Sequence, residues 1–127
     1  FDSGVGPDRV VLADGATDPH YTLVTNADNA QSTTVYAQDS TVWPIVSGPW
    51  FANNDVSRWI GPRADPSAAT ADGNYVYRTT LDLTGYDPAT VVLSGNWAAD
   101  NSAELVVNGV STGLTQSGFG GLATFTT

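Results

Sequence analysis

The residues best suited to binding chemistry lie between positions 43 and 59, where aromatic rings stand among amides, one carboxylate and one guanidinium. Sugars bind to such sets, because the C–H faces of a pyranose stack on indole rings while polar side chains hydrogen-bond the hydroxyls. The candidate ligand-binding residues are Trp43, Trp50, Asn53, Asn54, Asp55 and Arg58, with Phe51 and Trp59 beside them. We therefore expect carbohydrate binding to be centred on this segment.

Core packing is the competing interpretation for the tryptophans of this segment. The alternation of side chains favours a core position for Trp59 and for Trp97. Trp43 and Trp50 each neighbour a proline and fit either role. Of the two, Trp50 is the one that we expect to contact a ligand.

Aspartates in predicted turns offer a possible calcium site, since Ca²⁺ takes about six to eight oxygen ligands from carboxylates and carbonyls. The chain has no EF-hand spacing. Aspartates in turns are more commonly solvent-exposed residues that hydrogen-bond the nearby backbone, and we favour this interpretation over a metal site. No cofactor is required, and a structural calcium is an open alternative. The turn aspartates are Asp14, Asp18 and Asp28, which are the candidate metal ligands, together with Asp39, Asp55 and Asp100.

Catalysis has little support in the sequence. His20 is the only histidine and no GxSxG pattern occurs, so a nucleophilic triad would depend on His20 and Asp18. A lone histidine beside a turn more commonly serves as a hydrogen-bonding strut. Thirteen acidic residues make some carboxylate pair inevitable, and the single Glu104 is predicted on the wet face of a strand. We expect no catalytic residues.

Composition narrows the classes of partner. The chain has 127 residues, thirteen acids, four arginines, no lysine and a formal charge of −9, so we expect it to bind neither nucleic acid nor an anionic membrane. It has no cysteine, and no apolar run approaches the roughly 20 residues of a membrane helix. Nor does it show the pattern of a retained signal peptide. This composition indicates a secreted, extracellular or cell-surface protein.

The clearest structural pattern runs from Tyr75 to Thr112, where apolar and polar residues alternate with a period of two. We interpret it as a meander of three strands, over residues 75–83, 91–97 and 103–107, with turns at Asp87-Pro88 and at residues 100–102. Asn108-Gly109 predicts a two-residue type I′ hairpin that places Val107 opposite Val110 and Leu105 near Thr112.

The rest of the chain also reads as short strands, without an amphipathic helix. Two short strands are expected within residues 10–24, one over Thr33–Ala37 with Val35 inward, one over Ser57–Ile60 and one over Leu122–Thr127. Residues 26–31 and 63–74 are predicted loops, and residues 113–121 are rich in glycine and serine. This spacing favours an all-β antiparallel sandwich that forms a single domain over residues 1–127.

Several segments resemble the galactose-binding-like jelly rolls of bacterial secreted and cell-surface proteins. The resemblance covers nearly the whole chain and is carried by DPHY (18–21), GPWFANNDVSRWIGP (48–62), GNYVYRTTLDL (73–83) and WAADNSAELVVNG (97–109). It implies an antiparallel β-sandwich that is carbohydrate-binding or adhesive, in some cases with a structural calcium, and without catalytic residues. Modules of this type continue past the position of Phe125 with a further hairpin, so we expect a sandwich that lacks its last strands.

Such a sandwich would expose a sheet edge, and exposed edges accept strands from other chains. An alternative function is therefore a structural subunit of a filament or surface layer, in which copies of the chain exchange strands. Residues 1–12 are the expected donor, because Val10 and Leu12 alternate correctly. Head-to-tail donation of this kind builds an open homopolymer.

Overall fold

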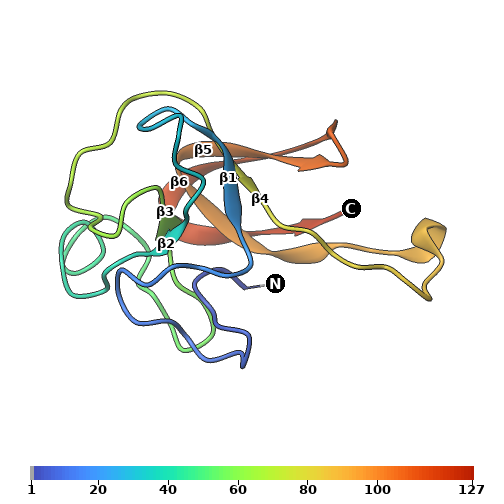
Figure 1. Ribbon diagram of the computed structural model, residues 1–127, viewed down its shortest axis with the longest axis horizontal. Coiled ribbons are helices and arrows are strands. Elements are labelled where there is room, and N and C mark those ends of the chain that lie inside the picture. Colours follow the sequence, from blue (N-terminus) through green and yellow to red (C-terminus); the bar gives the residue numbers. More distant parts are fainter. Residues whose placement is uncertain (1) are drawn as a thin grey trace. The chain divides into compact units, whose positions relative to one another are not determined.

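The computed structural model describes residues 2–127 and shows an antiparallel all-β protein (Figure 1). Three two-stranded sheets pair β1 with β4, β2 with β3, and β5 with β6. One short 3₁₀ helix, η1, begins at Pro88, where the fixed φ of proline suits the first turn, and Asp87 caps it by accepting a hydrogen bond from Ala89 N. The elements are β1 (Thr22–Asn26), β2 (Tyr36–Ala37), β3 (Ile60–Gly61), β4 (Tyr75–Arg78), η1 (Pro88–Thr90), β5 (Ser94–Val107) and β6 (Val110–Thr126).

The contacts divide the chain into two compact units. Unit 1 comprises Phe1–Gly48 and Ala52–Leu81, and unit 2 comprises Pro49–Phe51 and Asp82–Thr127. The expectation of a single domain over residues 1–127 stays a prediction.

Unit 1 contains the buried apolar core. Val35 is fully buried, which confirms that it points inward, although the strand beside it is shorter than expected and begins at Tyr36. Leu23 is buried on β1, where it pairs with Tyr77 of β4. The buried apolar residues are Val5, Leu23, Val35, Ala37 and Ile45.

The N-terminal residues of unit 1 form a small hairpin bound to the rest of that unit. Val5 bridges Val11, and Leu12 N donates to Gly4 O at 2.9 Å. Gly4 N donates to the buried carboxylate of Asp18 at 2.6 Å, and Arg58 N donates to Ser3 O at 2.8 Å. The described part of this stretch, residues 2–12, is therefore not a free strand donor, because its backbone and Val5 are held within its own unit.

Unit 2 is built on the long hairpin of β5 and β6. Asn108 and Gly109 have φ angles of 51° and 82°, and Val107 pairs with Val110, which confirms the predicted type I′ turn. Thr112 Oγ1 donates to Leu105 O at 2.7 Å, which confirms that these two residues lie close together across the hairpin. The predicted C-terminal strand is also confirmed as the end of β6, where Phe125 pairs with Gly95 and meets Trp97 edge to face at a centroid distance of 5.7 Å.

The predicted meander is wrong. The first of its three strands, β4, pairs with β1, which lies about fifty residues earlier, and the other two segments are one continuous strand, β5. No turn forms at residues 100–102. The strand continues there with a shift of register between Ala99 and Ser102, because β6 pairs with β5 both before and after this point. The Gly- and Ser-rich residues 113–121 belong to β6. Gly113 and Gly118 adopt positive φ in this strand, close to the shifts of register in its pairing with β5.

Two shorter predictions also need correction. The predicted strand over Ser57–Ile60 is displaced to Ile60–Gly61, because Asn54 accepts hydrogen bonds from Val56 N and Ser57 N and holds the chain in a turn. Of the two strands expected within residues 10–24, the first is a single bridge at Val11 and the second is β1. Residues 2–127 contain no helix long and apolar enough to cross a membrane.

Candidate functional site

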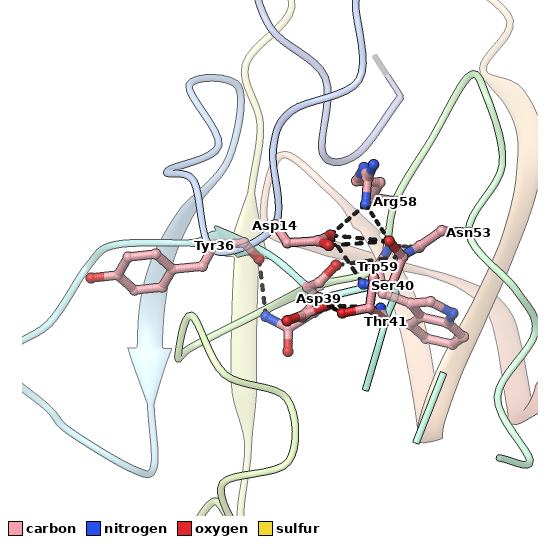
Figure 2. A network of polar contacts seen from close by, with 9 residues as sticks. Asp14, Tyr36, Asp39, Ser40, Thr41, Asn53, Arg58 and Trp59 are labelled. Atoms are coloured by element: carbon pink, nitrogen blue, oxygen red, sulfur yellow. Dashed lines mark hydrogen bonds and ion pairs between the residues drawn. The ribbon is translucent and has the colours of Figure 1, made fainter. Parts of the chain in front are cut away.

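A polar network in unit 1 is centred on the end of β2 (Figure 2). Gln38, which follows β2 and is 4% exposed, uses its amide nitrogen to donate to Tyr36 O at 3.1 Å and to Arg63 O at 2.7 Å. Its backbone N–H donates to Trp59 O at 2.8 Å, and its backbone carbonyl accepts from Asn53 Nδ2 at 3.4 Å. One buried residue thus ties β2 to the segment around Trp59 and to the loop that begins at Arg63.

The absence of a side chain at Gly61 makes room for this amide. A Cβ at Gly61 would lie 2.7 Å from the amide nitrogen of Gln38 and 2.8 Å from its Cδ. Gly61 pairs with Tyr36 in the ladder of β2 and β3, and it lies beside the Gln38 side chain. The hydrogen bonds from the Gln38 amide thus hold the backbones of Tyr36 and Arg63 close to each other.

Tyr36 and Arg63 line a concave surface, which we name the polar cleft. It encloses about 480 Å³, a size typical of small-molecule sites. Its charged pair is Arg63 and Asp28, and the other lining residues are Asn29, Ser32, Tyr36, Pro62 and Ala64.

The ion pair in the polar cleft is bidentate. Arg63 Nε donates to Asp28 Oδ2 at 2.6 Å, and Arg63 Nη2 donates to Asp28 Oδ1 at 2.7 Å. Ala71 N adds a third hydrogen bond to Asp28 Oδ1 at 3.2 Å. The hydrogen bonds from Arg63 lower the pKa of the Asp28 carboxyl, and the same pairing raises the pKa of Arg63. The pair is therefore charged at neutral pH and contributes no net charge to the cleft.

Other polar groups of the cleft remain available to a ligand. Within residues 2–127, the Tyr36 hydroxyl, the Ser32 hydroxyl and the Asn29 amide nitrogen donate no hydrogen bond to protein atoms. The Arg63 side chain is 43% exposed, whereas that of Asp28 is 10% exposed. The cleft thus presents several hydrogen-bonding groups and one aromatic ring at a single concave surface.

Most of the polar residues predicted to bind a ligand are instead bonded to the protein. Asn53 Oδ1 accepts from Trp59 N at 2.7 Å, and Asn54 Oδ1 accepts from Val56 N and Ser57 N, each at 2.9 Å. Arg58 Nη1 donates to Asp14 Oδ1 at 2.5 Å and to Ser40 Oγ at 3.0 Å (Figure 2). Asp55 is exposed in the turn that Asn54 forms.

The predicted aromatic residues fall into the two units. Trp43 belongs to unit 1 and is 60% exposed. Trp50 and Phe51 belong to unit 2, where Phe51 N donates to Phe119 O at 2.6 Å. Burial raises the pKa of the Asp100 carboxyl in unit 2, although a hydrogen bond from Trp50 opposes the rise. Trp59 and Trp97, which we expected in a core, are half-buried.

The three predicted metal ligands each have another partner. Asp14 pairs with Arg58, and Asp28 pairs with Arg63. Asp18 is buried and accepts from Gly4 N at 2.6 Å, His20 N at 2.7 Å and Tyr21 N at 3.2 Å. No group of three or more His, Asp or Glu side chains in residues 2–127 is placed to hold a metal ion.

Sequence reasoning missed the polar cleft. Tyr36 was predicted only as part of a short strand, and Arg63 only as part of a surface loop. Both residues line one cleft because Gln38 bonds both of their backbones, and a single glutamine gives no sequence signal of that role. The scarcity of basic residues could have pointed to the site, since Arg63 is one of only four arginines in a chain without lysine.

Comparison with family models, with curated proteins and with solved structures finds no match for this chain.

We predict that Gln38→Met will destabilise unit 1. Methionine has a similar size but cannot donate to Tyr36 O or Arg63 O, and a buried acceptor left without a donor costs about 1–3 kcal/mol. Urea unfolding followed by tryptophan fluorescence measures the change. Gln31→Met, at an exposed position, is the control, and equal stability of the two variants would contradict the role given to Gln38.

We predict that Arg63→Gln will raise the pKa of Asp28 toward its ordinary value of 3.8. Because folding lowers this pKa, the stabilisation from the pair is present above pH 3.8 and is lost as pH falls through the lowered pKa. The difference in unfolding free energy between wild type and Arg63→Gln should shrink over that acidic range. Carboxyl ¹³C titration by NMR checks the pKa, and an unchanged Asp28 titration in the variant would rule out this pairing.

Proposed function

We propose that the chain is a non-catalytic, extracellular carbohydrate-binding module whose ligand is a neutral saccharide held in the polar cleft of unit 1. The observation that carries the proposal is that Tyr36 and the Arg63–Asp28 pair line the same open cleft, of about 480 Å³. The function is the one expected from the sequence, but the proposed binding residues are different.

The side chains of the cleft match the chemistry of a sugar. A pyranose has apolar C–H faces that pack on an aromatic ring, and hydroxyls that both donate and accept hydrogen bonds. Tyr36 supplies the ring, Arg63 supplies donors, and the Asp28 carboxylate supplies acceptor oxygens. The hydroxyl of Ser32 and the amide of Asn29 add groups of both kinds.

The charges of the cleft favour a neutral ligand. Asp28 already neutralises Arg63 through two hydrogen bonds, so an anionic sugar would have to displace a bonded carboxylate. The chain as a whole carries a formal charge of −9, which adds repulsion toward polyanions. A neutral saccharide avoids both costs.

The same geometry argues for binding without hydrolysis. Glycosidases use two carboxyl groups, one of which has a raised pKa so that it can protonate the leaving group. Asp28 is the one carboxylate that lines the cleft, and Arg63 lowers its pKa. Asp28 is thus ionised near neutral pH and has no proton to give to a leaving group. The proposed function needs no cofactor.

We also infer that the all-β fold is of the galactose-binding-like jelly-roll type. This finer assignment rests on the sequence resemblance, and the antiparallel pairing in all three sheets is compatible with it. The extracellular or cell-surface location rests on composition, chiefly the absence of lysine and cysteine and the excess of aspartate.

We predict that Tyr36→Ala will weaken binding of a neutral oligosaccharide about tenfold or more, as loss of about 1.4 kcal/mol of stacking would give. Isothermal titration calorimetry against neutral oligosaccharides measures it. Tyr36→Phe keeps the ring and should bind nearly as well, and Tyr86→Ala, at a strongly exposed position in unit 2, should bind like wild type. Absence of binding to every neutral saccharide, or equal affinity for Tyr36→Ala and wild type, would refute the proposal.

Self-association is a second candidate function, favoured by the composition of β6. This strand is 17 residues long and contains no charged residue and no proline, although strands at sheet edges are usually protected by one or the other. No residue of unit 2 is fully buried, and a sheet of two strands alone is marginally stable in water. A strand added along β6 would increase both its backbone hydrogen bonding and its burial.

A second copy of the chain suits this edge. Two β6 strands can pair antiparallel about a two-fold axis without placing like charges opposite each other, whereas β5 carries Asp100 and Glu104. The acidic residues of β5 oppose further growth through that strand, so we expect dimers. This form of self-association uses β6 in place of the N-terminal donor, which is held within unit 1.

We predict that wild-type protein will dimerise reversibly at high concentration and that Leu122→Lys will stay monomeric. Leu122 lies on β6 and is 47% exposed, so the lysine adds a charge to the pairing strand without emptying a core position. Sedimentation velocity measures the association. Val56→Lys, in an exposed loop of unit 1, should dimerise like wild type. A wild-type protein that is monomeric at millimolar concentration would exclude this function.

A further inference from the structure

A second pocket of unit 1 lies at the N-terminal hairpin and differs from the polar cleft in that its arginine has no ion-pair partner among residues 2–127. It encloses about 430 Å³, and we name it the hairpin pocket. Val5 and Pro7 give it an apolar wall, whereas Arg9 and His20 give it polar nitrogen groups. The remaining lining residues are Asp2 and Gly6.

Arg9 occupies a backbone position that normally belongs to glycine. Arg9 N donates to Gly6 O at 3.0 Å, and Gly6 N donates to Val10 O at 2.9 Å, which defines a three-residue hairpin loop made of Pro7, Asp8 and Arg9. In such a loop a type I turn is followed by one residue in the left-handed region. Arg9 has a φ of 63°, which strains a side chain bearing a Cβ but not a glycine.

The Arg9 side chain has no internal partner that would offset this strain. Within residues 2–127 its guanidinium makes neither an ion pair nor a hydrogen bond with a side chain or the backbone. Arg58 and Arg63, by contrast, are both paired with aspartates. Residues that break a local backbone rule without an internal gain are commonly found at functional sites.

We infer that the hairpin pocket binds the carboxylate of a uronic acid residue, with Arg9 as its principal contact. The planar fork of a guanidinium matches a carboxylate through two parallel hydrogen bonds. Pro7 offers an apolar surface for the ring C–H groups. A monoanion suits the pocket better than a dianionic phosphate, because Asp2 also lines it and the chain carries a net charge of −9.

This inference rests on the proposed function as a saccharide-binding module, but it concerns a different site and a different class of sugar. In the polar cleft a bidentate pair with Asp28 occupies Arg63, and a neutral sugar is proposed there. In the hairpin pocket the Arg9 guanidinium has no ion-pair partner in the described part of the chain, and an acidic sugar is proposed.

Substitution of Arg9 by asparagine tests the inference, because asparagine tolerates the left-handed region but has no positive charge. We expect Arg9→Asn to lose at least about tenfold in affinity for a glucuronate-containing oligosaccharide, as loss of one charge-assisted bidentate contact would give. Its melting temperature should equal or exceed that of wild type, because the strain is relieved. Arg9→Gly should behave in the same way, and Arg9→Lys should bind with intermediate affinity.

The control is Arg78→Gln, which removes an exposed arginine on β4 and should leave uronate affinity unchanged. The methyl ester of the same oligosaccharide should bind no better to wild type than to Arg9→Asn. In ¹⁵N–¹H NMR spectra, the acidic sugar should shift the amide signals of Gly6, Val10 and His20.

Several outcomes would overturn the inference. It is wrong if Arg9→Asn binds uronate like wild type, if the ester binds as tightly as the acid, or if a peptide with a free C-terminal carboxylate binds better than the sugar. Neutral binding that depends on Tyr36, together with no uronate binding, would refute this inference alone. Failure of both neutral and acidic saccharides to bind would refute the proposed function as well.

Discussion

The buried amide of Gln38 is the interaction on which the candidate site depends. A buried amide without partners is costly, so the carbonyl groups of Tyr36 and Arg63 must lie within its reach. This requirement brings the end of β2 against a loop that is about twenty-five residues away in the sequence. The polar cleft is a consequence, because the Tyr36 ring and the Arg63 guanidinium project from the two backbones that the amide holds.

The scarcity of cations makes the positions of the four arginines informative. All four belong to unit 1, and acidic residues are the charged residues of unit 2. Arg58 joins Asp14 to Ser40 within the polar network, and Arg63 neutralises Asp28 in the cleft. Arg9 lines the hairpin pocket, and Arg78 is exposed on β4. Unit 1 is thus the part of the chain suited to polar ligands, and the uncharged β6 makes unit 2 suited to strand pairing.

The features predicted correctly from the sequence are those that local chemistry decides. Asn108-Gly109 favours positive φ angles whatever surrounds it, and Val35 has no polar group that could prefer water. The partner of β4 was mispredicted because alternation shows which face of a strand is apolar but not which strand lies beside it. Asn53 and Asn54 were predicted to bind a ligand because their amides suit sugars. In the structure their Oδ1 atoms accept hydrogen bonds from the backbone N–H groups of Trp59 and Ser57. Such side-chain-to-backbone bonds depend on the path of the chain, which residue types do not reveal.

The close approach of Gly61 to Gln38 links the evolutionary histories of these two positions. A methyl group at position 61 would collide with the amide, whereas a shorter side chain at position 38 would leave space for it. The order of substitution therefore matters, since shortening position 38 first makes a larger residue at 61 tolerable and the reverse order passes through a clash. In homologous chains the two positions should covary, with glycine at 61 wherever glutamine stands at 38. This epistasis would restrict the mutational routes by which the walls of the cleft can diverge.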